Sequence, residues 1–132
     1  MSQTNVEVVR AYLDACNAGD IDAMMDLCTP DVEAFPDIGF PDGRPLHGRE
    51  EFRRWVLELE EAWVSARWKT NEARAVGADR VLERGEWGGV GVGSSIETYA
   101  GYAALYTIRD GQIRRVEWFS EHDRALKAAG LE

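Results

Sequence analysis

The order of helix-like and strand-like segments constrains the fold of this chain more than any other feature. Apolar residues recur at helical spacing in the first half of the chain and alternate with polar residues in the second half. The predicted helices cover about 6–18, 21–28 and 49–62, and the predicted strands cover roughly 65–76, 80–91, 96–109 and 112–120. Helices followed by a run of strands are typical of an α+β fold with an antiparallel sheet.

The first predicted helix ends in a tight corner. Thr4–Glu7 fits a capping box at its start, and Gly19 stops it. Asp20 is placed to cap a second short helix, which Pro30 ends. Tyr12 borders the apolar face of the first helix, so we expect this hairpin of helices to lower one phenol into a pocket.

The rest of the chain is predicted to include a short strand, a long loop, a hairpin turn and a last helical turn. A short strand around 32–35 precedes 36–45, which holds three of the four prolines and predicts a structured loop. Asp110 and Gly111 predict a hairpin turn, and 123–130 predicts a last helical turn that ends at a glycine.

Glycines crowd the predicted strands, where each one favours a bulge, a bend or a close approach of two backbones. They occur at positions 85, 88, 89, 91, 93 and 101. A sheet so interrupted should curl strongly, and helices over its hollow side would leave a cone with an internal pocket. Residues 1–132 are expected to form one domain.

Composition excludes several classes of partner. The chain has 24 acidic and 15 basic residues, and its net charge of −9 repels nucleic acid and anionic lipid. It has no apolar run near the ~18 residues of a membrane span and no basic leader, so we expect a cytoplasmic protein. Cys16 and Cys28 are expected on the apolar sides of the first two helices, as buried reduced thiols.

Aromatic residues give the strongest indication of a ligand site. Five tryptophans in 132 residues exceed what core filling normally requires. The candidate ligand-binding residues are Trp55, Trp87, Tyr102, Tyr106 and Trp118. A pocket lined by them suits a small, flat, largely apolar molecule with a carbonyl or hydroxyl group. The alternative is that these rings fill the cone or build a dimer face.

Three segments resemble one known superfamily. The stretch from Tyr12 to Asp20, the entry His47–Phe52 and the ending Tyr106–Ile113 are similar to the NTF2-like superfamily, in its SnoaL-like branch. The resemblance implies a cone-shaped, curled antiparallel sheet covered by three N-terminal helices, and a homodimer through the convex side of the sheet. It leaves the reaction open, because this fold carries isomerases, dehydratases, cyclases, epoxide hydrolases and non-catalytic domains.

Within that superfamily, the corner after Tyr12 most resembles ketosteroid isomerase. The resemblance gives Tyr12 the role of a phenol that donates a hydrogen bond to a substrate oxyanion. The general base then falls on Pro36, with Asp37 next to it, and the second oxyanion donor falls on Ala104. The chain therefore departs from the isomerase pattern, although a shift of one residue would restore Asp37 as a base.

A second carboxylate is suggested by SnoaL-type cyclases, which resemble this chain in carrying an acid/base group near the end of the sheet. The nearest candidates are Glu117 and Glu121, and the alternative for Glu117 is a cross-strand pair with a neighbouring arginine. Which face of the last strand lines the pocket is left open by its pattern. The candidate catalytic residues are thus Tyr12, Asp37 and Glu117.

Two hypotheses of function follow. The first is a small-molecule enzyme without a cofactor, which performs proton transfer as an isomerase, cyclase, hydrolase or dehydratase on a hydrophobic carbonyl or hydroxyl compound. The second is a non-catalytic ligand-binding or dimerisation domain, favoured by Pro36 and Ala104 at the two departures. No metal is expected, since the sequence lacks HExxH, EF-hand and Cys/His spacings.

Overall fold

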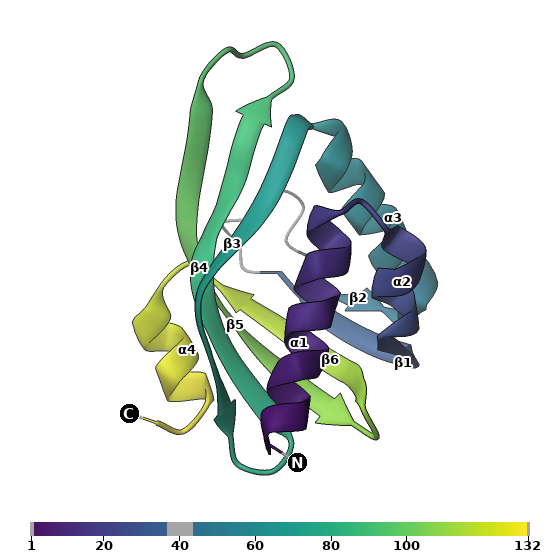
Figure 1. Ribbon diagram of the computed structural model, residues 1–132, viewed down its shortest axis with the longest axis vertical. Coiled ribbons are helices and arrows are strands. Elements are labelled where there is room, and N and C mark those ends of the chain that lie inside the picture. Colours follow the sequence, from purple (N-terminus) through teal and green to yellow (C-terminus); the bar gives the residue numbers. More distant parts are fainter. Residues whose placement is uncertain (1, 37–43, 132) are drawn as a thin grey trace.

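One strongly curled sheet forms the body of the molecule, with helices on both of its sides (Figure 1). The computed structural model describes residues 2–36 and 44–131. The helices are α1 (Ser2–Asn17), α2 (Ile21–Asp26), α3 (Gly48–Glu61) and α4 (His122–Ala128). The strands are β1 (Cys28–Phe35), β2 (Leu46–His47), β3 (Trp63–Val76), β4 (Arg80–Gly91), β5 (Glu97–Arg109) and β6 (Gln112–Phe119). These elements confirm the predicted α+β cone.

Strand order in the sheet is β2-β1-β6-β5-β4-β3. Strands β3 to β6 form the predicted antiparallel meander, and Asp110 and Gly111 both have positive φ in the turn between β5 and β6. Strand β1 instead pairs in parallel with β6, with Ala34 opposite Val116. The prediction of a wholly antiparallel sheet therefore needs this one exception. β1 and β6 are separated in the chain by β2, α3, β3, β4 and β5, which leaves them free to pair in the same direction.

Two predicted boundaries in the N-terminal third are wrong. Helix α1 already begins at Ser2, so the predicted capping box Thr4–Glu7 lies inside the helix rather than at its start. The side chain of Asn5 donates to Ala78 O at 2.9 Å. Helix α2 ends at Asp26, so Cys28 opens β1 rather than closing a helix. The reason is that Cys28 is already paired with Ile113 of β6. Both cysteines are free thiols.

The corner after α1 fastens that helix to the edge of the sheet. Gly19 has a φ of +74°, and Asp20 caps α2 by accepting from Ala23 N at 3.1 Å, as predicted. Asn17 makes two hydrogen bonds to one residue of edge strand β3. Its Nδ2 donates to Trp68 O at 2.9 Å, and its Oδ1 accepts from Trp68 N at 2.8 Å. The side-chain amide thus takes the place of a neighbouring strand at that point.

Glycine allows the sheet to bend where β4 meets its neighbours. A Cβ on Gly85 would lie 2.1 Å from Lys69 O, and one on Gly88 would lie 2.0 Å from Thr98 O. Asn71 is an extra residue in β3 beside Gly85, which makes a bulge. The predicted close backbone approach is therefore confirmed at Gly85 and Gly88, and it bends the sheet over its hollow side.

The sheet separates two hydrophobic cores. The concave core lies between the sheet and helices α1, α2 and α3, and its largest members are aromatic. The convex core lies under α4 and contains Val76, Leu82, Ala103, Leu105, Ala125 and Ala129. The concave side therefore positions the candidate site.

Candidate functional site

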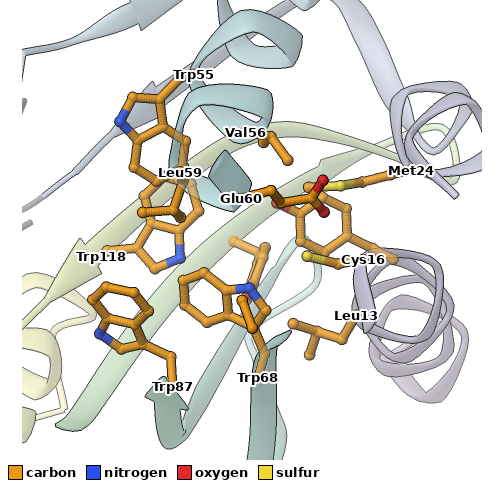
Figure 2. Close-up of a pocket in the computed structure, with 13 residues that line it drawn as sticks. Leu13, Cys16, Met24, Trp55, Val56, Leu59, Glu60, Trp68, Trp87 and Trp118 are labelled. Carbon is orange, nitrogen blue, oxygen red and sulfur yellow. The ribbon is translucent and has the colours of Figure 1, made fainter. Parts of the chain in front are cut away.

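A narrow cavity lies inside the concave core, between α1, α3 and the sheet (Figure 2). Its volume is about 20 Å³, which is room for roughly one water molecule. Its walls are formed by Tyr12, Leu13, Cys16, Met24, Trp55, Val56, Leu59, Glu60, Ala66, Trp68, Trp87, Tyr106 and Trp118. Ligand pockets usually hold ~300–1,000 Å³, so a ligand would have to part these side chains.

Four tryptophans form a stack of nearly parallel rings along one wall. The ring centroids of Trp55 and Trp118 are 5.3 Å apart, and those of Trp68 and Trp87 are 5.5 Å apart, with both pairs stacked. Between the two pairs, Trp68 and Trp118 are 6.4 Å apart and tilted by 30°. Figure 2 shows Trp55, Trp87 and Trp118 on the side of the cavity away from Cys16 and Met24, with Trp68 between these three indoles and Cys16. The widest step in the stack is therefore the one between Trp68 and Trp118.

Tyr12 is buried against the centre of this core, with 3% of its surface exposed. Its ring packs edge-on against Tyr106 at 5.9 Å and lies 6.4 Å from Phe52. Burial raises the pKa of Tyr12 well above its usual value, and the nearby Cys28, Cys16 and Glu83 raise it further. The phenol therefore stays protonated at neutral pH and is a hydrogen-bond donor.

A buried carboxyl group lies beside the cavity in the middle of β4. Glu83 is fully buried, and three hydroxyl groups donate to it. Tyr106 donates to Oε1 at 3.0 Å, Thr70 donates to Oε2 at 3.1 Å, and Tyr102 also donates to Oε2. Such a set of donors satisfies a carboxyl group that water does not reach.

This cluster has perturbed pKa values. Desolvation raises the pKa of Glu83, and the hydrogen bonds from Tyr102, Tyr106 and Thr70 oppose that rise only in part. Burial and the adjacent Glu83 raise the pKa of Tyr102 and of Tyr106. A carboxyl group whose pKa is moved upward is suited to exchange a proton nearer neutral pH.

Most of the predicted ligand-binding residues lie together. Trp55, Trp87, Tyr106 and Trp118 line the cavity. Tyr102 stands outside its wall, with its ring edge-on to Trp68 at 5.1 Å and its hydroxyl on Glu83. Four of the five aromatic residues named from the sequence therefore line one cavity, whereas Tyr102 belongs to the carboxyl cluster around Glu83. That they bind a ligand stays a prediction.

The predicted carboxylates do not join Tyr12 among the described residues. Asp37 lies outside the part of the chain that the structure describes. Glu117 is on the opposite face of β6 from Val116 and Trp118, and its Oε1 is 3.4 Å from Nε of Arg115. Glu117 thus pairs with a neighbouring arginine, but with one on its own strand rather than with the cross-strand partner that the alternative expected.

Glu83 is the residue that sequence reasoning missed. Alternation along β4 puts Val81, Glu83 and Gly85 on the same face as Trp87, which was itself predicted to line the pocket. Counting back from Trp87 in steps of two residues would have placed Glu83 on the concave face of the sheet. Glu60 and Trp68 were also absent from the predicted site, although both line the cavity.

The cavity reaches the surface at the ends of α1 and α3. Cys16, Glu60 and Ala66 line both the cavity and an outer groove of about 400 Å³, whose other walls include Asn17 and Arg67. Figure 2 shows the Glu60 side chain extending from α3 towards Cys16. Desolvation and the nearby Glu60 raise the pKa of the Cys16 thiol to about 12, against an opposing hydrogen bond from Trp68. Cys16, at the mouth where the cavity opens to the surface, is therefore a protonated and unreactive thiol.

Neither a metal centre nor a membrane span is visible in residues 2–36 and 44–131. In this part of the chain, no three His, Cys, Asp or Glu side chains are grouped so that they would hold a metal ion. None of the described helices has the length and apolar character needed to cross a bilayer.

Comparisons with known proteins identify the fold more clearly than the reaction. A model of the SnoaL-like domain matches residues 9–116, whereas no curated protein matches the chain. A cystatin-fold protein from Novosphingobium aromaticivorans is 25% identical, with a TM-score of 0.74 and coverage of 90% of this chain and 98% of that one. A putative polyketide cyclase from Sinorhizobium meliloti is also 25% identical, with a TM-score of 0.66 and coverage of 86% and 94%.

A third solved structure is similar over more of this chain. It is a protein with a ketosteroid isomerase-like fold from Catenulispora acidiphila, in complex with trimethylamine. It is 21% identical, with a TM-score of 0.77 and coverage of 96% of this chain and 94% of that one.

Proposed function

Because the chain belongs to the SnoaL-like domain family, we propose that it is a small-molecule enzyme that performs proton transfer without a cofactor. Its substrate is a flat, largely apolar compound with a carbonyl or hydroxyl group. The observation that carries this proposal is the buried Glu83 carboxyl, held by two tyrosine hydroxyls directly beside an aromatic cavity that Tyr12 lines.

Tyr12 has the role of the hydrogen-bond donor to the substrate oxygen. Its raised pKa keeps the proton on the phenol, and the apolar surroundings strengthen a hydrogen bond to a developing oxyanion. The resemblance to ketosteroid isomerase gives the tyrosine at this position the same role.

Glu83 has the role of the acid/base group, and it acts through Tyr106. The ring of Tyr106 lines the cavity while its hydroxyl donates to Oε1 of Glu83. With Glu83 in its ionised form, the Tyr106 hydroxyl gives its proton to Oε1 of Glu83 as its oxygen accepts one from the substrate, and the reverse transfer restores the carboxylate. Glu83 lies directly opposite Ala104 in the register of β4 and β5. Ala104 is the position that corresponds to the second oxyanion donor of the isomerase.

The other two predicted carboxylates take different places in this proposal. Asp37 remains a predicted base, because it lies outside the described residues. Glu117 has no part in the chemistry, because it is on the outer face of the sheet beside Arg115.

Exchange of ketone α-protons in D₂O tests the proposal without knowledge of the natural substrate. NMR would follow the exchange in planar cyclic ketones such as 2-tetralone. We expect the protein to accelerate exchange above buffer, and Tyr12→Phe to slow it by roughly 10²–10³-fold. Tyr99→Phe is the matched control, since Tyr99 lies under Lys69 Nζ at the surface, and it should not change the rate. A rate equal to that of buffer for all the ketones would contradict the proposal.

A non-catalytic ligand-binding domain is the second candidate. It is favoured by the small volume of the cavity, about 20 Å³, and by the stacked indoles that fill the space around it. Titration with planar phenols and ketones separates the two candidates. Quenching of tryptophan emission at saturation, with no exchange of ketone protons, would favour binding without chemistry.

A homodimer through the convex side of the sheet is a further part of this proposal, supported by the resemblance to the family. Helix α4 already covers the convex core, so the partner would contact the sheet beyond it, where Lys69 and Tyr99 lie. Light scattering behind size exclusion measures the mass directly. A monomer mass at the highest usable concentration would contradict the dimer.

A further inference from the structure

The walls of the cavity carry one charged side chain, and it is negative. Glu60 is the one charged residue that lines the cavity in the described part of the chain, and the remaining wall consists of aromatic rings, aliphatic groups and Cys16. Within residues 2–36 and 44–131, no lysine, arginine or histidine lines it. An anionic ligand would therefore meet a carboxylate and no compensating charge in surroundings that screen poorly.

Glu60 has no cationic partner among the described residues. The other acidic residues of the helical layer show the contrast, since Asp22 lies 2.6 Å from Arg53 and Glu50 lies 3.4 Å from Arg54. Both of those pairs are well exposed, whereas Glu60 is half-buried at the mouth. The carboxylate at the mouth therefore has room for a cation supplied by a ligand.

Two helix ends add to the negative potential at this mouth. Helix α1 ends at Asn17 and α3 ends at Glu61, and neither has a basic residue in its last turn. The outer groove contains residues from both ends, with Glu60 between them and the cavity. The carbonyl end of a helix carries a partial negative charge that favours cations. Arg67 lines the outer groove and is exposed, but it is not among the described residues that line the cavity.

Indole faces complete the environment. The ring centroids of Trp68 and Trp118 are 6.4 Å apart with the rings tilted by 30°, and each of the two indoles is stacked with another one. These indoles line the cavity, so a flat ligand ring that enters it would pack against them. Indole faces also attract organic cations more strongly than other side chains do.

We propose that the ligand of this cavity is a planar molecule with a positively charged nitrogen, whose ring packs against the indoles of Trp68 and Trp118 and whose charge pairs with Glu60. The inference rests on the proposed function only in that this cavity takes a ligand. It adds the charge of that ligand, which neither the fold nor the family supplies.

Calorimetric titration with three compounds of nearly the same shape tests the charge. They are 1-naphthylmethylammonium, 1-naphthalenemethanol and 1-naphthoate. We expect the ammonium to bind at least tenfold more tightly than the alcohol, and the carboxylate to bind more weakly than either. Glu60→Gln should weaken ammonium binding about tenfold and change alcohol binding less than twofold. The matched control is Glu61→Gln, an exposed neighbour on the same helix, which should change neither more than twofold.

Equal affinities for ammonium and alcohol would overturn the inference, as would an equal loss of both in Glu60→Gln. Absence of binding by the ammonium also overturns it. The proposed enzyme function is tested by a different measurement, the exchange of ketone protons. If the protein prefers the ammonium compound but exchanges no ketone protons, the enzyme proposal is contradicted and the cation site is supported. If it exchanges ketone protons but shows no preference for the ammonium compound, the cation site is contradicted and the enzyme proposal is supported.

Discussion

The two sides of the sheet hold hydrophobic cores of different chemistry. The convex core is built from alanine, valine and leucine under α4. The concave core holds stacked indoles and buried tyrosines, and the Glu83 carboxyl lies against it. Both are close to fully buried, so solvent exposure does not distinguish them.

The difference indicates which side of the sheet has a role beyond stabilising the fold. Aliphatic packing stabilises a fold without the cost of desolvating polar groups, and the convex side shows that this sheet can be covered in that way. Burying a carboxyl beside an apolar cavity costs free energy even when hydroxyls satisfy it. The concave side bears that cost, which is typical of a site for chemistry.

Removal of the buried carboxyl should have the largest effect. Glu83→Ala leaves three hydroxyl groups without their acceptor and opens a cavity, so we expect the free energy of unfolding to fall by about 3–5 kcal/mol. Urea denaturation measures it. Glu86→Ala, at an exposed position of the same strand, should stay within about 0.5 kcal/mol. A loss as small as that of the control would show that the cluster is not coupled to the fold.

The same carboxyl should be visible in the pH dependence of stability. The pKa of Glu83 is raised above its ordinary 4.5, so the folded protein holds this proton more tightly than the unfolded chain. The resulting stability is present below pH 4.5 and is lost as the pH rises through the raised pKa. Relative to Glu83→Gln, the wild type should therefore lose stability as the pH rises over this range. The opposite slope would mean that the hydroxyl donors outweigh desolvation.

Truncation in the convex core should come next. Leu105→Ala should lower the free energy of unfolding by about 2–4 kcal/mol, because Leu105 is buried between the sheet and α4. Tryptophan emission of the folded variant should match that of the wild type, since no tryptophan belongs to this core. A shifted spectrum would show that the two cores are not independent.

Loss of the α1 corner contact should have a moderate effect. Asn17→Ala removes both hydrogen bonds to the backbone of Trp68, and we expect a loss of about 1–2 kcal/mol. Faster hydrogen exchange at the Trp68 amide should accompany it. Asn71→Ala, at the exposed bulge in the same strand, is the control and should leave that amide protected.

The smallest effect is expected on the outer face of β6. Glu117→Gln removes one partner of a half-exposed pair with Arg115, which should change stability by less than about 0.5 kcal/mol. The rate of ketone proton exchange should be unchanged. A tenfold fall in that rate would restore Glu117 as the acid/base residue.

The fold was more predictable from the sequence than the site. Helical spacing, the Asp110–Gly111 turn and the glycines of β4 each report a local requirement, so they gave the elements and the curl. The parallel pairing of β1 with β6 depends on residues about 80 positions apart, which no local pattern reports. Glu83 was missed because its neighbours in sequence, Leu82 and Arg84, face the other side of the sheet. Its partners come from β3 and β5.

The contact between Asn17 and Trp68 has a consequence for solubility. Strand β3 is a 14-residue edge strand, and the free backbone groups of such an edge invite pairing with another chain. The Asn17 amide occupies both backbone groups of Trp68 in the interior of this edge, and α1 lies along it (Figure 1). The corner that brings Tyr12 into the cone therefore also hinders copies of this protein from extending one another's sheets into aggregates.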